Sequence, residues 1–528
     1  MSHHLPPLWK FHGGVHLEKC ANLTHTQIVP AALPEKLTVP LSQHLGEPAT
    51  PIVQVGDKVL KGQVIAQCLE CSEDTVTARI HAPTSGVITG IAALPVPHPS
   101  ALSAPCIIIE PDGKEQWITL NPVKTCVNLT SEELRRTIAQ SGIVGLGGAG
   151  FPSHLKINPG DIQTLILNGA ECEPYITCDD CLMRERAEQV VIGTRILAHA
   201  LGGVKRCIIA IEDNKPEAIA AIKAVLDSDD GKYQISTEQL DVISVPARYP
   251  MGGERQLIRV LTGHALPRSN LPRDFGIVVH NVGTAAAIYQ AVKIGKPLIS
   301  RVVTITGDGV NTRQNMEVLL GTPMSDLLAQ CDVKTDVSGL IMGGPMMGLA
   351  LPSASLPIIK TTNCLIASAQ TAIDTVTPAM PCIRCGACEQ VCPAELLPQQ
   401  LYWYAKANDF DKVQRYNLFE CIECGCCAYV CPSQIPLVQY YRYAKAAVRT
   451  RDAEKLQAER ARERFEFRSF RLEREKAERK ARHQQKRNAL KKPVAGAKNV
   501  VTDKQAAIAA AQARVKAKKA AKPDKTDD

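Results

Sequence analysis

Short apolar runs separated by turn residues mark the first part of the chain. Between residues 50 and 92, runs such as Val59-Leu60 and Val64-Ile65 follow turns at Gly56-Asp57 and Gly62-Gln63, and Ala82-Pro83 precedes another run. Short strands with glycine turns between them are typical of a small β-sandwich. We therefore expect an N-terminal β-sandwich over residues 1–125.

The pattern of this segment, V-x-x-G-D-x-V-x-K-G-Q followed by A-P-x-x-G, resembles lipoyl and biotinyl carrier domains. Such a carrier needs a lysine in the hairpin between its two halves. None occurs between Lys61 and Lys114. The lipoyl-like domain is therefore expected to be unmodified and structural.

From residue 126 to 300 the pattern changes to buried strands alternating with helices. Wholly apolar runs begin near Thr164, Cys207, Val242 and Gly276, with helical stretches at 184–201 and 215–226. Apolar strands separated by helices are typical of a parallel sheet covered on both faces. An α/β domain is predicted, and its first helix is expected to be capped by Ser131.

β signals return between residues 301 and 360, in Arg301–Thr306 and around Ile341, and predict a small β-grasp domain of the SLBB type.

The segment 446–528 is rich in Arg, Glu, Lys and Ala, with Glu475/Arg479 and Glu478/Arg482 at helical i,i+4 spacing. Few apolar residues interrupt it. We predict an exposed helix that passes into disorder.

Charge is divided unevenly along the 528 residues. Residues 446–528 hold 25 Lys and Arg against 12 Asp and Glu, so this segment carries +13 and the remainder −5 of the net +8. A basic tail on an acidic body favours contact with anionic lipid or an acidic partner over nucleic acid. No run approaches the roughly 18 apolar residues of a membrane span, so a soluble or peripheral chain is expected.

Two cysteine runs between residues 370 and 445 carry the most specific chemistry. Cys382, Cys385, Cys388 and Cys392-Pro393 form one C-x2-C-x2-C-x3-C-P pattern, which Cys421, Cys424, Cys427 and Cys431-Pro432 repeat. This is the spacing of bacterial [4Fe–4S] sites, in which the fourth cysteine of each run ligates the other cluster. The first cluster is therefore assigned to Cys382, Cys385, Cys388 and Cys431, and the second to Cys421, Cys424, Cys427 and Cys392.

Zinc sites and disulfides are the alternatives for these cysteines. A zinc site would use well-separated C-x2-C pairs, and disulfides belong to oxidising compartments, whereas the N-terminus does not resemble a secretion signal. Cys426 breaks the spacing, so it is expected not to be a ligand. We predict a ferredoxin-like, α-helical domain with two clusters.

A glycine-rich loop, Gly145-Leu-Gly147-Gly148-Ala-Gly150-Phe151-Pro152, contains a formal G-x-G-x-x-G. A dinucleotide-binding turn of this kind follows a strand and opens a helix. This loop instead follows the helix expected from Ser131, with no strand between them. On its own the loop is a weak signal, and a plain glycine turn remains an alternative.

The residues around this loop resemble the flavin site of the NADH-oxidising, 51-kDa-type subunit of respiratory complex I, with its GGAGFP…LK and N-A-D-E-G-E-P motifs. The resemblance implies non-covalent FMN and NAD(H) as substrate. Lys156 would hold phosphate, and two glutamates would bind sugar hydroxyls or orient nicotinamide. Ala170, Arg255, His280 and Gly283 depart from the family pattern, which leaves nicotinamide binding open. The implied cofactor-binding residues are Gly145, Gly147, Gly148, Gly150, Phe151, Lys156, Asn168, Glu171, Glu173, Glu254, Asn281 and Thr284.

The order of units over residues 5–445 resembles the RnfC (RsxC) family, the C subunits of Rnf electron transport complexes. Its marks are Phe11–His16, Ile211–Pro216, Pro250–Glu254 and Met342–Gly348. The resemblance implies an ion-translocating oxidoreductase subunit, peripheral on the cytoplasmic side of the cell inner membrane. It would dock onto the A, B, D, E and G subunits of an Rnf complex and exchange electrons between NADH and a ferredoxin-type partner, with no catalytic residue beyond the cofactors.

Two other functions remain possible from the sequence. One is a soluble flavin/iron–sulfur reductase, such as the cobalamin reductase of catabolic microcompartments. The other is a non-enzymatic electron relay that has lost its flavin site. The long basic tail favours membership of a membrane complex over the first, and the intact loop residues with Lys156, Glu171 and Glu173 argue against the second.

Overall fold

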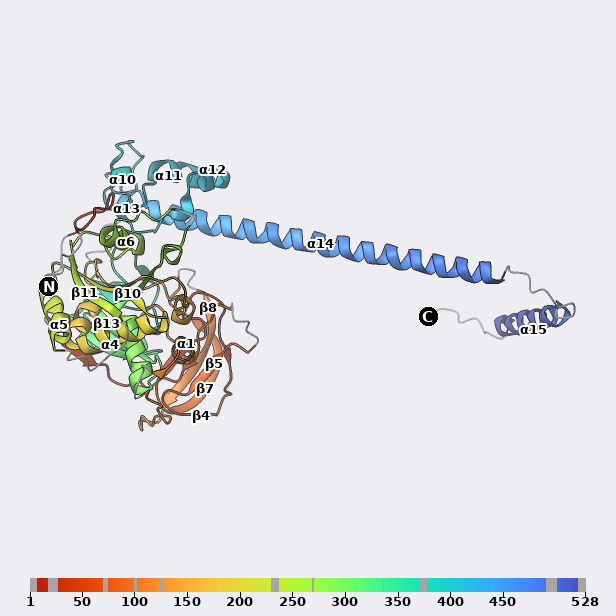
Figure 1. The fold of residues 1–528 in the computed structure, drawn as a ribbon, viewed down its shortest axis with the longest axis horizontal. Helices are drawn as coiled ribbons and strands as arrows, with labels where there is room; N and C mark the ends of the chain where they lie inside the picture. The colour runs from red at the N-terminus through yellow and green to blue at the C-terminus, as the bar shows by residue number, and fades with distance from the viewer. Residues whose placement is uncertain are drawn as a thin grey trace. The chain divides into compact units, whose positions relative to one another are not determined.

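The computed structural model divides into two compact units, Met1–Ala446 and Ala447–Asp528 (Figure 1). The residues that it describes are 7–17, 27–69, 75–98, 102–123, 128–228, 237–267, 270–335, 337–369, 378–490 and 501–520.

The N-terminal domain is a sandwich of two small antiparallel sheets. Apolar side chains of both sheets, among them Leu37, Ile65 and Ile107, are fully buried in one cluster. The lysine-free hairpin expected between the halves falls partly outside the described residues. One sheet has the order β2 (Leu37–Pro40), β8 (Ser103–Pro111), β7 (Gly86–Pro95), β4 (Lys58–Val59), and the other β3 (Thr50–Pro51), β5 (Val64–Gln67), β6 (Ile80–His81).

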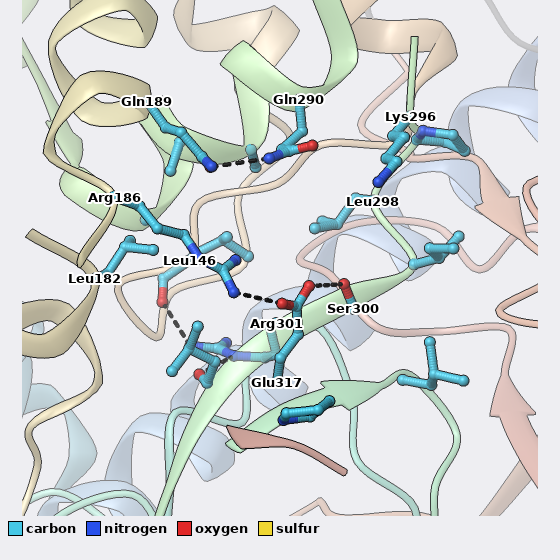
Figure 2. Close-up of a pocket in the computed structure, with 18 of the residues that line it drawn as sticks. Leu146, Leu182, Arg186, Gln189, Gln290, Lys296, Leu298, Ser300, Arg301 and Glu317 are labelled. Carbon is cyan, nitrogen blue, oxygen red and sulfur yellow. Dashed lines mark hydrogen bonds and ion pairs between the residues drawn. The ribbon is translucent and has the colours of Figure 1, made fainter. Parts of the chain in front are cut away.

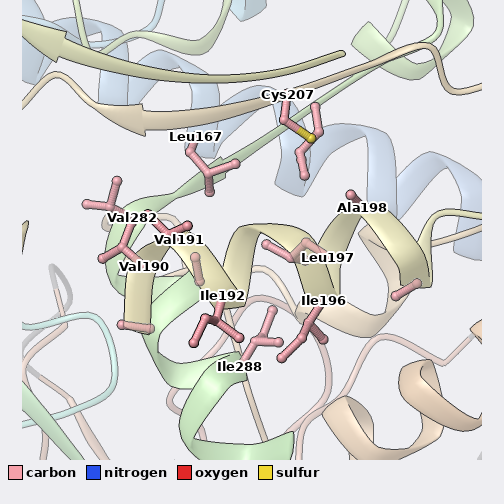
Figure 3. Close-up of a cluster of buried hydrophobic side chains, with 14 of the residues drawn as sticks. Leu167, Val190, Val191, Ile192, Ile196, Leu197, Ala198, Cys207, Val282 and Ile288 are labelled. Atoms are coloured by element: carbon pink, nitrogen blue, oxygen red, sulfur yellow. The ribbon is translucent and has the colours of Figure 1, made fainter. Parts of the chain in front are cut away.

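The central domain is a four-stranded parallel sheet with buried side chains on both faces. Leu167 of one strand and Cys207 of the next face the helices on one side, where Ile196 and Ile288 pack (Figure 3). Ile166 faces the opposite side. This alternation explains why the strands are apolar at every position. The order is β11 (Thr237–Val245), β10 (Val204–Glu212), β9 (Thr164–Gly169), β12 (Ile277–Asn281).

The helices of this domain differ in detail from the sequence prediction. The first helix is capped by Thr130, not Ser131, because Thr130 and Glu133 form a reciprocal capping box. The stretch expected as one helix over 184–201 is two helices. The helices are α1 (Ser131–Gln140), α2 (Ser153–Lys156), α3 (Cys178–Glu185), α4 (Ala187–Ala200), α5 (Pro216–Asp227), α6 (Glu254–Thr262), α7 (Val282–Tyr289) and a π-helical turn at Gln290–Ile294.

A six-stranded mixed sheet follows, and it takes in more of the chain than the expected 301–360. Its first strand comes from the N-terminal segment and pairs in parallel with a strand nearly three hundred residues later. The order is β1 (Ile28–Pro30), β14 (Gln314–Leu319), β13 (Ser300–Thr306), β17 (Cys364–Ala369), β15 (Val337–Met342), β16 (Leu349–Leu351), with α8 (Met324–Gln330) after β14. Its identity as a β-grasp domain remains a prediction.

The two cysteine runs lie on loops and short helices. Tyr402, Val413 and Tyr441 join Cys392 and Cys427 in one buried cluster, so the cysteines help to form the core of this domain. The helices are α10 (Ala387–Gln390), α11 (Pro398–Lys406), α12 (Phe410–Arg415), the 3-10 turn Leu418–Glu420, α13 (Cys426–Tyr429) and the start of α14 (Leu437–Leu490).

The second unit consists of the rest of α14 and of α15 (Val501–Ala520). Apart from Val448, which is buried, and a few half-buried positions, its described side chains are exposed. Among the i,i+4 ion pairs of its described residues are Arg462–Glu466 at 3.3 Å, Arg471–Glu475 at 3.8 Å and Arg474–Glu478 at 3.6 Å, each with arginine on the N-terminal side of glutamate. In the described part of the chain, no helix combines the length and the apolar character of a membrane span.

Candidate functional site

The middle of the glycine-rich loop, residues 147–149, is exposed to solvent. The backbone N–H of Gly145 donates to the carbonyl of Phe151 at 2.8 Å, and that of Gly150 donates to the carbonyl of Gly145 at 3.2 Å, so the loop closes on itself. Gly147, Gly148 and Ala149 are exposed between these bonds. Gly148 has φ +103°, a conformation that favours glycine, and no atom of the described residues lies within 4 Å of the position that a Cβ would take.

Buried groups hold the loop from below through Leu146. The backbone N–H of Leu146 donates to Thr284 Oγ1 at 3.0 Å, and its carbonyl accepts from Arg301 at 3.3 Å. Both side chains are buried, and burial lowers the pKa of Arg301. Thr284, expected to contact the cofactor, thus supports the loop backbone. Arg301, which begins a predicted strand, carried no sequence signal for this role.

Two asparagines stand side by side at the carboxyl ends of neighbouring parallel strands. Asn168 on β9 pairs in register with Asn281 on β12. Asn168 donates to the carbonyl of Gly252 at 2.8 Å, and Asn281 donates to Asp179 at 2.6 Å. A Cβ at Gly147 would lie 3.2 Å from the Asn281 side chain, so the loop packs directly over this edge of the sheet. Ligands bind at this edge in open α/β sheets.

Charged groups border the same edge. Lys156 Nζ lies 2.7 Å from a Glu254 oxygen, and the two side chains are 35% and 41% exposed, so both remain accessible to a ligand. His280, one strand residue before Asn281, is buried. Burial and the nearby Lys156 lower its pKa to about 3, which keeps the ring neutral. Among the described residues, no hydrogen-bond partner faces His280 Nε2.

The two predicted glutamates occupy different surroundings. Glu171 is buried and forms an ion pair with Lys215 at 2.8 Å, while it also accepts from the backbone N–H of Asp179 at 2.9 Å. Burial, then repulsion from Glu171, raises the pKa of Asp179 to about 7. The Glu171 carboxylate is therefore used inside the domain, and its expected contact with a sugar or nicotinamide remains a prediction. Lys215 belongs to the Ile211–Pro216 motif, but the sequence assigned it no role.

Glu173 reaches across to the six-stranded sheet. Its carboxylate accepts from the backbone N–H groups of Met346 and Met347 at 3.1 and 2.9 Å. Burial raises the pKa of Glu173 to about 7 despite these bonds. Glu173 therefore ties the strand-end segment to the loop that follows β15.

These residues fit a flavin mononucleotide. Exposed glycine amides, the Lys156 ammonium and the unpartnered His280 nitrogen converge at one sheet edge, and such donors suit a phosphate. Because Gly147 and Gly148 have no side chains, the exposed part of the loop leaves room for a flat ring. Gly145, Gly147, Gly148, Gly150, Lys156, Asn168, Glu254 and Asn281 lie around this edge, whereas Thr284 and Glu171 lie beneath it.

A separate cavity of about 530 Å³ lies where three domains meet (Figure 2). Trp117 of the sandwich, Gln290 of the central domain and Ser300 of the six-stranded sheet contribute to its walls. An ion pair between Arg186 and Glu317, 2.5 Å long, crosses it. Leu146 and Gly283 line it, but none of the twelve predicted cofactor-binding residues does, so it is distinct from the flavin edge.

Eight cysteines gather around two small cavities in the helical domain. One cavity is lined by Cys382, Cys385, Cys388 and Cys431. The other is lined by Cys392, Cys421, Cys424 and Cys427, with Cys426 also on its wall. Each set combines three cysteines of one run with the fourth of the other. These are the sets expected for crossed ligation of two [4Fe–4S] clusters, and the donors suit them.

The cavity lined by Cys392, Cys421, Cys424 and Cys427, called here the second-run cavity, lies against the flavin domain. The cavity lined by Cys382, Cys385, Cys388 and Cys431 is called the first-run cavity. Tyr249 Oη donates to the carbonyl of Cys424 at 2.6 Å. Near the N-terminus, Gly14 N–H donates to the carbonyl of Val391 at 2.9 Å, and His12 Nδ1 lies 3.0 Å from the carbonyl of Cys392. Tyr249 immediately precedes the Pro250–Glu254 motif, but it was not singled out from the sequence.

Three family models match parts of the chain. They are an RnfC barrel sandwich hybrid domain over residues 9–114, a Nuo51 FMN-binding domain over residues 138–290, and a 4Fe-4S dicluster domain over residues 381–435. The β-sandwich, the FMN domain and the dicluster domain predicted from the sequence are thus confirmed. FMN and two [4Fe–4S] clusters are the cofactors that these domains support.

Curated relatives match almost the whole chain. The C subunit of the ion-translocating oxidoreductase complex of Vibrio cholerae is 48% identical over 97% of this chain, which spans 65% of that protein. The protein of the same name from Serratia proteamaculans is 44% identical over 97% of this chain and 70% of that protein. A solved NAD+-reducing [NiFe]-hydrogenase chain, 16% identical with a TM-score of 0.42 over 62% of each chain, is too dissimilar to support an inference.

The chain therefore spans about two thirds of the length of these relatives, and its match to them runs through the sandwich, the flavin domain and the two cysteine runs alike. It belongs to the RnfC family, the C subunits of ion-translocating oxidoreductase complexes.

Proposed function

We propose that this chain is the NADH-side subunit of an ion-translocating electron transport complex. It exchanges electrons between NAD(H) and a ferredoxin-type partner, while other subunits of the Rnf type couple this exchange to ion movement. The subunit is peripheral, on the cytoplasmic side of the inner membrane. Support comes from the membership of the family and from the described helices, none of which suits a membrane span.

The observation that carries the proposal is the contact between the flavin domain and the second-run cavity. Tyr249 lies on the segment that leads into α6, and its hydroxyl bonds the backbone of the Cys424 loop. Gln256 of α6 donates to the carbonyl of Pro393 at 3.3 Å. One short segment thus borders the flavin edge at Glu254 and the cysteine cavity at Tyr249.

The residues at the flavin edge have separable tasks. Lys156 and the neutral His280 offer donors to a phosphate, and the exposed amides of Gly147 and Gly148 offer more. Glu254 holds Lys156 in place at 2.7 Å. FMN, when bound, accepts two electrons with a hydride and passes them on singly, which NADH and iron–sulfur clusters require. Beside it, Arg301 and Thr284 fix the loop through Leu146.

The test is to purify the full chain with its clusters and measure bound FMN and NADH-dependent reduction of a one-electron dye. We expect about one FMN per chain and dye reduction that Lys156→Met weakens mainly by loss of FMN. A matched control is Lys205→Met, on the exposed start of β10. A chain that contains its iron–sulfur clusters but takes up neither FMN nor NADH would refute the proposal.

A further inference from the structure

The two cysteine runs form the same loop twice. Arg384 and Glu423, at equivalent positions, have φ 57° and 58°, and Gly386 and Gly425 have φ 80° and 81°. A four-residue helix follows each glycine, α10 in the first run and α13 in the second. Because the backbones agree, any difference between the two loops comes from what packs on them.

The flavin domain and the six-stranded sheet cover the second loop. A Cβ at Gly425 would lie 2.9 Å from the carbonyl oxygen of Met346. Ile422 packs in a cluster with Tyr249 and Met346, and Cys424 is buried. The second-run cavity is therefore closed on its outer side by another part of the same chain.

The equivalent face of the first loop is open. Around Gly386, no atom of the described part of the chain lies within 4 Å of the position that a Cβ would take. Ile383, the counterpart of Ile422, is 68% exposed, and Met380 beside it is 63% exposed. Cys385, the counterpart of buried Cys424, is the one exposed cysteine of the eight that line the two cavities. Apolar side chains thus stand in solvent around the edge of the first-run cavity.

We propose that the first-run face, defined as Met380, Ile383, Arg384 and Cys385, is the docking surface for a one-electron redox protein. This inference rests on the proposed function. The flavin domain covers the second loop around Ile422. The first loop has the same backbone and an isoleucine at the equivalent position, Ile383, so we expect a partner to cover it in the same way. Exposed apolar residues at an accessible site mark interaction surfaces.

The partner's chemistry follows from the position of the face. The face gives access to the first-run cavity, so the occupant carries a redox centre at its own surface, within an apolar rim that meets Ile383 and Met380. A single electron crosses the contact without atoms or protons, and one centre gains what the other loses. Small interfaces serve such transient exchanges, and a few central side chains carry most of their binding energy.

The experiment uses the full chain in its membrane complex, with a photo-crosslinking amino acid at Ile383. The matched control carries it at Tyr429, which is 56% exposed on α13 and likewise lies between cysteines of a run. We expect the Ile383 probe to crosslink a cofactor-bearing protein, identified by mass, and the Tyr429 probe not to do so. Crosslinks from Ile383 to another part of this chain or to a second copy would overturn the proposal.

Ile383→Asp and Tyr429→Asp supply a second readout. With cluster content equal by EPR spin count, we expect Ile383→Asp to reduce affinity for the electron partner about tenfold or more, the effect of losing ~1.4 kcal/mol. NADH-to-dye activity should be unchanged in both variants. If affinity also stays unchanged, the docking face is wrong while the proposed function stands. If the unsubstituted chain does not reduce the dye with NADH, the proposed function itself is refuted.

Discussion

Removal of Lys215 should strongly destabilise the central domain. Its ammonium lies 2.8 Å from Glu171, and the two side chains are 8% and 5% exposed. Burial opposes the charge of Lys215, but the carboxylates of Glu171 and Glu212 outweigh it and raise the pKa. Lys215→Met leaves Glu171 buried without its cation and close to Asp179.

The size of the loss follows from this burial. Breaking a buried ion pair by removing one partner costs about 3–5 kcal/mol. Lys156→Met is the matched control, since its pair with Glu254 is more than a third exposed and should contribute about 0–1 kcal/mol.

Urea unfolding of the flavin-free chains, followed by circular dichroism, measures the difference. With a slope of about 2 kcal/mol per M, Lys215→Met should lower the midpoint by about 1.5–2.5 M and Lys156→Met by less than about 0.5 M. Adding Glu171→Gln to Lys215→Met removes the unpaired charge and should recover most of the loss. Equal midpoint shifts for the two lysine variants, or no recovery in the double variant, would refute the reasoning.

Three further outcomes are expected. Burial lowers the pKa of Lys360 to about 7, so the folded chain binds that proton less tightly than the unfolded one, and stability should rise with pH from about 7 to 10.5. Lys360→Met should remove this part of the rise in thermal midpoint with pH. A rise in Lys360→Met equal to that of the unsubstituted chain would contradict the prediction. Cys392→Ala should damage the second-run cluster more than the first, and EPR showing loss of the first-run cluster alone would exclude crossed ligation. Gly425→Ala should make the cysteine domain more sensitive to protease than Gly386→Ala, because only the methyl group added at Gly425 meets Met346. Equal protease sensitivity of the two variants would contradict this.

The sequence predicted those features that depend on local pattern. Apolar runs located the parallel strands, since each strand is buried on both faces, as Ile166 and Leu167 illustrate. Cysteine spacing predicted two crossed sets because a two-residue gap brings neighbouring thiols to one centre, and the structure gathers those sets around two cavities.

Features that depend on distant partners did not follow from the sequence. The contact of Glu171 with a ligand remains a prediction, and the sequence did not show that its carboxylate pairs with Lys215, about 44 residues later. The role of Arg301 depends on its bond to Leu146, which belongs to another domain. The helix cap moved by one residue because Ser131 and Thr130 are both capable caps, and only the Glu133 partner distinguishes them.

The pairing of β1 with β14 has a consequence for biosynthesis. Ile28 meets Asn315, roughly 290 residues later, so at about 5–20 residues per second a ribosome needs some 15–60 s after making the first strand before its partner exists. For that interval the segment 28–30 must remain unpaired while the sandwich beside it is free to fold. The other five strands of the six-stranded sheet lie at residues 300–369, so this sheet is completed only after the flavin domain has emerged, although its first strand is made before that domain.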